Sequence, residues 1–274
     1  MTELSEKAGS YNFNDIGKGG EELRRLQLQA SAAIDLEISM LTNKGLKKGD
    51  KILDLACGPG VITRQLAKND PTASITGMDL NLELLEIARS EAKKNNINSI
   101  DFIHGDVYEP PLQDSQFDFI YARLLFQHLK DPKKALNAIY QLLKPGGRIC
   151  IFDIDDDWLS LHPEPNGFKA FTETVGEIQS RKGGNRKVGR QLGSLVESSG
   201  YKNVTVNVQT ISSRDIGMKA FLDITLGFKS RMLSDIDLAK SKKTLTETES
   251  LITNPRAWAF VGVFIAAGIR EKNY

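Results

Sequence analysis

The sequence lacks several features that mark specialised classes of protein. Its two cysteines, Cys57 and Cys150, lie in separate apolar runs, which argues against a disulfide framework or a zinc site and fits a reducing, cytoplasmic compartment. Its 36 basic and 35 acidic residues leave a formal net charge of +1, so no overall field attracts nucleic acid or an anionic membrane. The longest apolar run, residues 257–269, is too short to cross a bilayer. We therefore expect no nucleic-acid partner and no membrane partner.

What is present is typical of a globular protein, with 40% apolar and 26% charged residues. The 274 residues suffice for one α/β domain with additions. Residues 1–20 are polar and contain glycine, so we expect a loose arm there and no signal peptide.

From residue 50 onward, predicted strands and helices alternate. Asn81 and Asp131 are the expected N-caps of two helices, and Pro132 suits a first helical position. The predicted strands cover 52–57, 74–79, 100–104, 117–122 and 148–154, and the predicted helices cover 21–41, 61–69, 82–95 and a segment from 132 that ends at "KPGG" (144–147). This alternation predicts a doubly wound parallel sheet.

The regular alternation of predicted strands and helices ends after residue 155. A helix at 188–199, a strand at 203–211, a mostly helical segment at 214–252 and the apolar run at 257–269 predict a terminal antiparallel pair. We expect one domain in three parts: residues 1–45 form an arm and a cap helix, 46–155 form the cofactor-binding core, and 156–274 supply the acceptor pocket, a helical insertion and the final strands.

The stretch "KILDLACGPGVIT" (51–63) predicts a binding loop. Gly58 and Gly60 allow a sharp turn between strand and helix, and Asp54 is costly inside an apolar strand unless it has a function. Asp79 ends the next strand, where a carboxylate can accept both hydroxyls of a ribose. Asp106, in "HGDV", can read an adenine amino group. A dinucleotide fingerprint would need a third glycine, which this loop lacks.

The ordered set "ILDLACGPG", Asp79, "GDV", "FDFIYAR" and "LLKPGGRI", over about residues 50–155, resembles the class I S-adenosylmethionine-dependent methyltransferases. "EELRRLQLQA" and "SRKGGNRKVGRQLGSLVESSGY" resemble a bacterial group of these enzymes that methylate small molecules. The resemblance implies a seven-stranded Rossmann-like sheet, mostly parallel with an antiparallel final strand, and a helical cap. Ala56 stands where the family usually has glycine, a departure that a negative φ would accommodate.

The resemblance also implies site residues. S-adenosylmethionine, with S-adenosylhomocysteine as product, would be bound by Tyr11, Arg25, Asp54, Ala56, Gly58, Gly60, Asp79, Leu80, Asp106, Val107, Ala122 and Arg123. The acceptor would meet Phe126, Gln127, Asp153, Asp155, Trp158, Phe168 and Phe171. Methyl transfer from a sulfonium needs alignment and exclusion of water, and it needs a base only when the acceptor must lose a proton. His128 and His162 are the candidate bases, and the sequence does not choose between them.

The acids of "DIDDD" (153–157) could bind magnesium, as acids do in catechol methyltransferases. Successive side chains in this stretch point in different directions, however, so they do not form an identifiable ligand set. We predict no metal, and expect Asp156 and Asp157 to be solvated or to cap a helix. The basic turn "SRKGGNRK" (180–187) is interpreted as solvated.

The leading hypothesis is methyl transfer to an O, N or C atom of a small-molecule metabolite by a monomer or homodimer. One alternative is methylation of a protein or an RNA. The "ARLL" after the fourth strand lacks the Asn/Asp-Pro-Pro-aromatic motif of DNA amino-methyltransferases. The other alternative is a non-catalytic cofactor-binding module.

Overall fold

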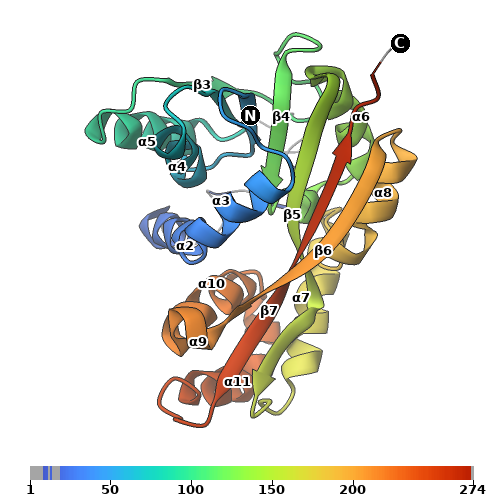
Figure 1. Cartoon of the computed structure of the whole chain (residues 1–274). Helices are drawn as coiled ribbons and strands as arrows, with labels where there is room; N and C mark the ends of the chain where they lie inside the picture. Colours follow the sequence, from blue (N-terminus) through green and yellow to red (C-terminus); the bar gives the residue numbers. More distant parts are fainter. Residues whose placement is uncertain (1–8, 12, 14–18, 273–274) are drawn as a thin grey trace.

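The computed structural model describes residues 9–11, 13 and 19–272. Its sheet has seven strands in the order β3-β2-β1-β4-β5-β7-β6 (Figure 1). Strands β1 to β5 pair in parallel, and β7 runs antiparallel between β5 and β6, which confirms the predicted fold class. The strands are β1 (Lys51–Leu55), β2 (Ser74–Asp79), β3 (Ile100–His104), β4 (Phe117–Arg123), β5 (Leu143–His162), β6 (Lys202–Ser212) and β7 (Trp258–Ile269).

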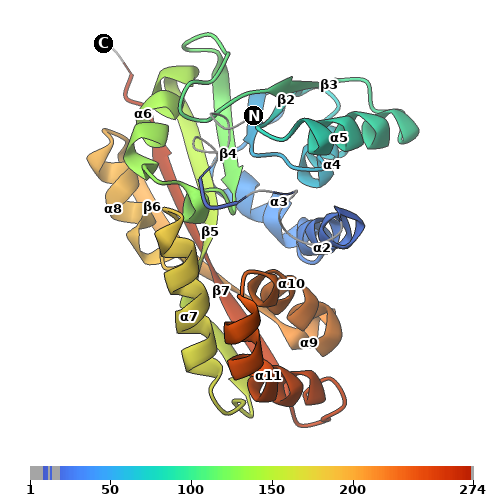
Figure 2. The same ribbon diagram turned by 180° about the vertical axis from the view of Figure 1, so that it is seen from behind.

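The helices cover both faces of this sheet and extend beyond it (Figure 2). Both predicted N-caps are confirmed, because the Asn81 side chain accepts the N–H of Leu84 and the Asp131 side chain accepts the N–H of Lys134. The helices are α2 (Gly19–Ser31), α3 (Ile34–Asn43), α4 (Val61–Asn69), α5 (Leu82–Lys94), η2 (Phe126–His128), α6 (Pro132–Leu142), α7 (Phe168–Arg181), η3 (Gly189–Gln191), α8 (Leu192–Ser198), α9 (Ser213–Ile216), α10 (Met218–Arg231) and α11 (Asp235–Ser250).

Three element boundaries differ from the sequence prediction. The helix expected over 21–41 is two helices, because Ala33 leaves the helical region at φ −144°. Strand β5 begins at Leu143, so "KPGG" lies inside the strand, and it continues to His162 because β7 pairs with it on both sides of a bulge between Ile154 and Leu159. The helix expected over 188–199 is a 3-10 turn followed by α8.

Alternate residues of the central strands pack on opposite faces of the sheet. Leu53 and Ile120 pack with α6 and α8, whereas Ile52 and Phe119 pack with α4. A third apolar cluster, which includes Leu161, Phe171 and Phe221, joins the outer halves of β5 and β7 to α7 and α10. This extension holds α10 against α2, across the carboxyl ends of the parallel strands (Figures 1 and 2).

Candidate functional site

A cavity of about 860 Å³ opens at the carboxyl ends of the parallel strands, where ligands bind in doubly wound sheets. Its outer part is lined by the loops after β1, β2 and β3. Its inner part is lined by α2, α10 and the bulged region of β5 and β7. This volume lies near the upper end of the usual range for small-molecule sites, so a nucleoside and a second small ligand can share it.

The loop after β1 turns through left-handed backbone conformations. Gly58 has φ +54° and Gly60 has φ +69°. A Cβ at Gly60 would lie 2.9 Å from the Cβ of Ala88, so packing also requires glycine there, whereas a Cβ at Gly58 would meet no atom within 4 Å. Ala56 has φ +56°, so the negative φ that would have accommodated alanine is not present. Alanine in this region costs roughly 1–2 kcal/mol, so the loop geometry is retained at the expense of strain.

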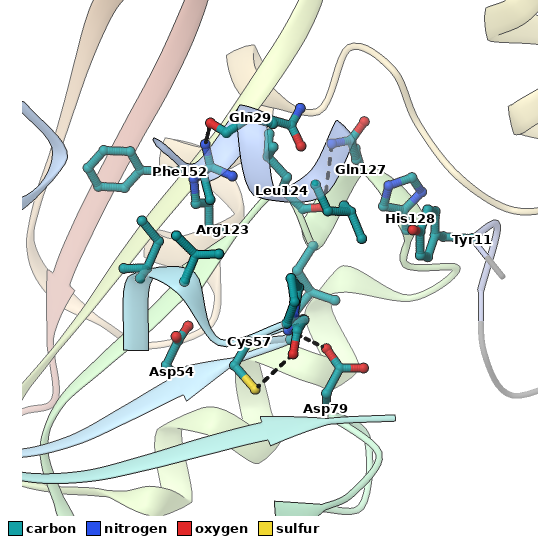
Figure 3. Close-up of a pocket in the computed structure, with 18 of the residues that line it drawn as sticks. Tyr11, Gln29, Asp54, Cys57, Asp79, Arg123, Leu124, Gln127, His128 and Phe152 are labelled. Carbon is teal, nitrogen blue, oxygen red and sulfur yellow. Dashed lines mark hydrogen bonds between the residues drawn. The ribbon is translucent and has the colours of Figure 1, made fainter. Parts of the chain in front are cut away.

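Asp79 ties the end of β2 to the glycine loop. One carboxylate oxygen accepts the N–H of Gly58 at 2.8 Å, and the other accepts the N–H of Asn81 at 2.8 Å (Figure 3). Burial raises the pKa of this carboxyl, opposed by the backbone N–H groups that donate to it. Asp79 and Leu80 both line the cavity, where the ribose was predicted.

Asp54 lies beneath the same loop and is buried. The hydroxyl of Thr63, in the first turn of α4, donates to its carboxylate at 2.6 Å. Burial raises the pKa of Asp54 to about 7. The bond joins β1 to α4 across the glycine turn, and Asp54 also faces the cavity.

The loop after β3 forms another wall of the outer cavity. Asp106 and Val107, the residues predicted to hold the adenine, both line it, and the Asp106 side chain accepts the N–H of Tyr108 at 2.9 Å. After β4, Arg123 lines the cavity, whereas Ala122 is fully buried in the core. The Arg123 side chain donates to Glu37 at 3.0 Å and to the Gln29 carbonyl at 2.9 Å, so it fastens α2 and α3 to the sheet (Figure 3).

The described part of the N-terminal arm lies at the cavity wall. The Tyr11 hydroxyl donates to Glu22 at 2.9 Å, and Arg25 makes a two-point contact with the same carboxylate. Both Tyr11 and Arg25 line the cavity, and their contact with the cofactor stays a prediction. The Tyr11 ring lies 5.2 Å from the ring of His128 (Figure 3).

His128 lies in η2 at the same wall, and burial with nearby Arg186 and Arg25 lowers its pKa to about 3. The amide nitrogen of Gln179 donates to the Gln127 carbonyl at 2.8 Å and also points at His128 Nδ1 at 3.4 Å. Because an amide nitrogen can only donate, the Gln179 contact assigns Nδ1 as an acceptor and Nε2 as the N–H of a neutral ring, and the Ser10 hydroxyl lies 3.0 Å from the same Nδ1. In this geometry His128 is a donor.

The predicted aromatic acceptor wall is wrong, because its members point elsewhere. Trp158 is 44% exposed and packs on Phe264, and Phe168 and Phe171 lie in the apolar cluster of the extension. His162 is exposed at the far end of β5, opposite Trp258 of β7. The sequence could not show that β5 continues for eight residues beyond Ile154 and carries these side chains away from the site. Phe126 is a core residue, whereas Gln127 does line the cavity.

The acids after β5 are also arranged differently from the prediction. Asp153 is buried and accepts the N–H groups of Gln127 and Ile154, and Asp155 is buried and pairs with Arg190. Neither lines the cavity. The acid that does is Asp156, expected to be solvated or to cap a helix. It follows Phe152 and Ile154 along the cavity side of β5, so the alternation of the strand continues past its predicted end at residue 154 and directs Asp156 inward.

Sequence reasoning missed the partners of Asp156. Arg186, from the turn interpreted as solvated, is buried and donates twice to Asp156 at 2.9 Å and once to Gln127 at 2.6 Å. Lys229 of α10 is buried and lies 3.2 Å from Asp156. Burial lowers the pKa of Lys229 to about 8, and the positive charges of Arg186 and Lys229 lower the pKa of Asp156 to about 2.

Within residues 9–11, 13 and 19–272, no group of three or more His, Cys, Asp and Glu side chains is placed to hold a metal ion. Metal-independent activity remains a prediction. No helix of the described chain is long and apolar enough to span a bilayer.

A model of a methyltransferase domain matches residues 46–177, which contain the glycine loop, Asp79 and Asp106. Residues 46–177 form a domain of the class I S-adenosylmethionine-dependent methyltransferases. The predicted family is thereby confirmed, together with the nucleoside cofactor that defines it.

Relatives of this chain include proteins from bacteria and yeast. An uncharacterised Streptomyces fradiae protein is 32% identical over 67% of this chain and 52% of its own length. An uncharacterised Schizosaccharomyces pombe methyltransferase is 32% identical over 62% of each chain. A Staphylococcus aureus demethylmenaquinone methyltransferase is 26% identical over 66% of this chain and 80% of its own. The chain thus spans from about half to three fifths of the first two relatives.

The fold is shared with a solved structure of Haemonchus contortus phosphoethanolamine N-methyltransferase 2, in complex with phosphomonomethylethanolamine and S-adenosylhomocysteine. The TM-score is 0.58 at 19% identity, and the match covers 87% of this chain and 53% of that one. At this identity the likeness shows the fold.

Proposed function

We propose that this protein transfers the methyl group of S-adenosylmethionine to an O, N or C atom of a small molecule. The observation that carries the proposal is one continuous cavity that begins at Gly58, Asp79 and Asp106 and ends between α2, α10 and the bulged part of β5. The outer end has the groups that a nucleoside needs, and the inner end has room for an acceptor. Family membership supports the assignment of the outer end.

The position of α10 favours a small acceptor over a protein or an RNA. Helices α10 and α2 pack against each other over the inner cavity, and Ile224 and Phe228 of α10 line it together with Leu26 of α2. A macromolecular substrate would have to displace this packing to present one atom to the methyl group. The demethylmenaquinone and phosphoethanolamine methyltransferases among the matches act, by their names, on small molecules.

Each group at the outer end has a proposed role. When bound, S-adenosylmethionine supplies a sulfonium whose methyl group is open to in-line displacement. Asp79 holds the ribose hydroxyls, Asp106 and Val107 hold the adenine, and the loop at Gly58 lies beside the methionine portion. Asp54 stays beneath the loop and maintains its turn through Thr63. The walls exclude water and align the acceptor with the methyl group.

His128 serves in this proposal to orient the acceptor by donating a hydrogen bond from Nε2, rather than to remove a proton. The Ser10 and Gln179 contacts to Nδ1 support this assignment. An acceptor that needs no base, such as a neutral amine or a carboxylate, fits a site of this kind.

The proposal is tested with purified protein, S-adenosylmethionine and a metabolite panel, with release of S-adenosylhomocysteine as the readout. We expect tight binding of S-adenosylhomocysteine by calorimetry and turnover with one class of small acceptor. Turnover only with protein or RNA would favour the macromolecular alternative. Binding without turnover on any acceptor would favour a non-catalytic module.

A further inference from the structure

The inner end of the cavity contains more positive charge than its own carboxylates can neutralise. Arg25, Arg186 and Lys229 line it, and Asp156 is the acid at their centre. Behind this surface Glu22, which is fully buried, pairs with Arg25 at 2.6 Å and with Arg231 at 3.0 Å. The group thus has four cations and two carboxylates, and with the buried carboxyl of Asp153, which Arg186 also attracts, at least one positive charge remains in excess. We call these six residues the inner basic cluster: Glu22, Arg25, Asp156, Arg186, Lys229 and Arg231.

The three lining cations converge on one place. The guanidinium carbons of Arg25 and Arg186 lie 5.5 Å and 5.9 Å from the centre of the Phe228 ring, and Lys229 is the next residue of α10. Each comes from a different part of the chain: α2, the turn before η3, and α10. Arg186 and Lys229 share the single carboxylate of Asp156, and Arg25 and Arg231 share that of Glu22. Because incompletely compensated buried charge is expensive, this arrangement favours an anion from outside the chain.

A second ion-pair group in the protein shows what a structural network looks like. On the outer side of β5, Asp155 and Asp157 pair with Lys187 and Arg190, two acids with two bases. That group is balanced, and its two cations are each about half exposed. The inner basic cluster is not balanced, and its two cations beside Asp156 are buried, since Lys229 is 2% and Arg186 7% exposed. Structural pairing therefore accounts for the outer group and not for the inner one.

The walls between this cluster and the glycine loop are apolar. Ile154, Ile211, Ile224, Val261 and Val263 line the cavity around the same end. A ligand that fits must therefore have an apolar body and an anionic group that reaches Arg186 and Lys229. Guanidinium and ammonium groups together bind carboxylates and phosphates through charge-assisted hydrogen bonds.

On the basis of the proposed function, we propose that the methyl acceptor is an organic anion, a carboxylate or phosphate monoester with an apolar body, whose anionic group is held by Arg186 and Lys229. The anion neutralises the excess charge of the inner basic cluster and anchors the acceptor at the end of the cavity away from the cofactor. Its apolar body then extends toward the glycine loop, where the methyl group is delivered.

The test uses protein saturated with S-adenosylhomocysteine and calorimetric titration with matched pairs of probes. The pairs are 4-hydroxybenzoate with 4-hydroxybenzamide, and phenyl phosphate with phenol. We expect an anionic member to bind at least tenfold more tightly than its neutral partner. The carboxylate and phosphate arms distinguish the two anion classes.

The decisive variant is Lys229→Met, which removes one charge and keeps an apolar stem of similar length, while Asp156 stays paired with Arg186. It should weaken the preferred anion about 10- to 100-fold, the range for a hydrogen bond to a charged group, and leave the neutral probe and S-adenosylhomocysteine unchanged. Lys187→Met, in the balanced outer group, is the matched control for a lost positive charge and should change none of these affinities.

Three outcomes would overturn the proposal. Neutral probes could bind as tightly as the anions, or no anion could bind in the millimolar range. Lys229→Met could instead weaken S-adenosylhomocysteine, which would show that the cluster holds the cofactor's own carboxylate. Failure of the wild-type protein to bind S-adenosylhomocysteine at all would instead contradict the proposed function, so the two failures are distinguishable.

Discussion

Replacement of Asp79 by alanine tests the cofactor site most directly. The carboxylate is held in place by the N–H groups of Gly58 and Asn81, each at 2.8 Å, so its oxygens are aimed before any ligand arrives. In the Asp79→Ala variant the ribose loses its two charge-assisted acceptors. We expect a loss of about 2–4 kcal/mol in binding free energy, or about 30- to 700-fold in the dissociation constant.

The assay is calorimetric titration with S-adenosylhomocysteine, accompanied by urea unfolding to confirm that the sheet is intact. Asp101→Ala is the matched control, because Asp101 is an exposed acid on the neighbouring strand β3 and should bind like the wild type. A folded Asp79→Ala protein whose affinity stays within about threefold of the wild type would refute the assignment of Asp79. Preference of the wild type for a nicotinamide dinucleotide would refute the assignment of the whole outer cavity.

Four further changes probe the loop, the buried acid, the metal question and the arm. Ala56→Gly should raise the free energy of unfolding by up to about 1 kcal/mol in urea, because relief of strain at φ +56° is only partly offset by the greater freedom of glycine in the unfolded chain. Burial raises the pKa of Asp54 from 3.8 to about 7, so the folded state binds this proton more tightly than the unfolded state does. The free energy of unfolding should therefore fall as the pH rises from about 4 to 7, and the Asp54→Asn variant should lack the contribution of this group to that decrease. Turnover should persist in excess EDTA. Deletion of residues 1–20 should leave the sheet folded but lower both S-adenosylhomocysteine affinity and turnover, because Tyr11 contacts Glu22 and His128 at the cavity wall.

Each of these predictions has an outcome that contradicts it. Ala56→Gly could prove no more stable than the wild type, or Asp54→Asn could keep the full pH dependence. Loss of activity in EDTA with rescue by magnesium would make the acids after β5 candidate ligands. A deletion variant that binds S-adenosylhomocysteine normally would show that the arm takes no part in the site.

The sequence alone was sufficient for the sheet and the cofactor loops, because those depend on local patterns. Apolar strands that alternate with capped helices specify parallel pairing, and Asn81 and Asp131 act as the caps that their types predict. Gly58, Asp79 and Asp106 follow successive strands, and parallel strands bring their carboxyl ends to one edge. The conformation of Ala56 was beyond this reasoning, because side-chain type does not specify the φ that a neighbouring turn imposes.

The inner cavity was decided only by tertiary structure. Asp156 faces the cavity because β5 continues beyond residue 154 and keeps its alternation, which places Asp156 on the side of Phe152 and Ile154 and buries Asp153 and Asp155 elsewhere; the length of the strand is set by its pairing with β7. Arg186 and Lys229 are 43 residues apart in the sequence. They meet at Asp156 because α10, which contains Lys229, packs against α2 at the cavity. The spacing of apolar residues in the sequence indicates which face of its own helix or strand a residue occupies. Which distant charge it meets depends on how the elements pack, and in this protein that packing creates the unbalanced charge at the end of the cavity.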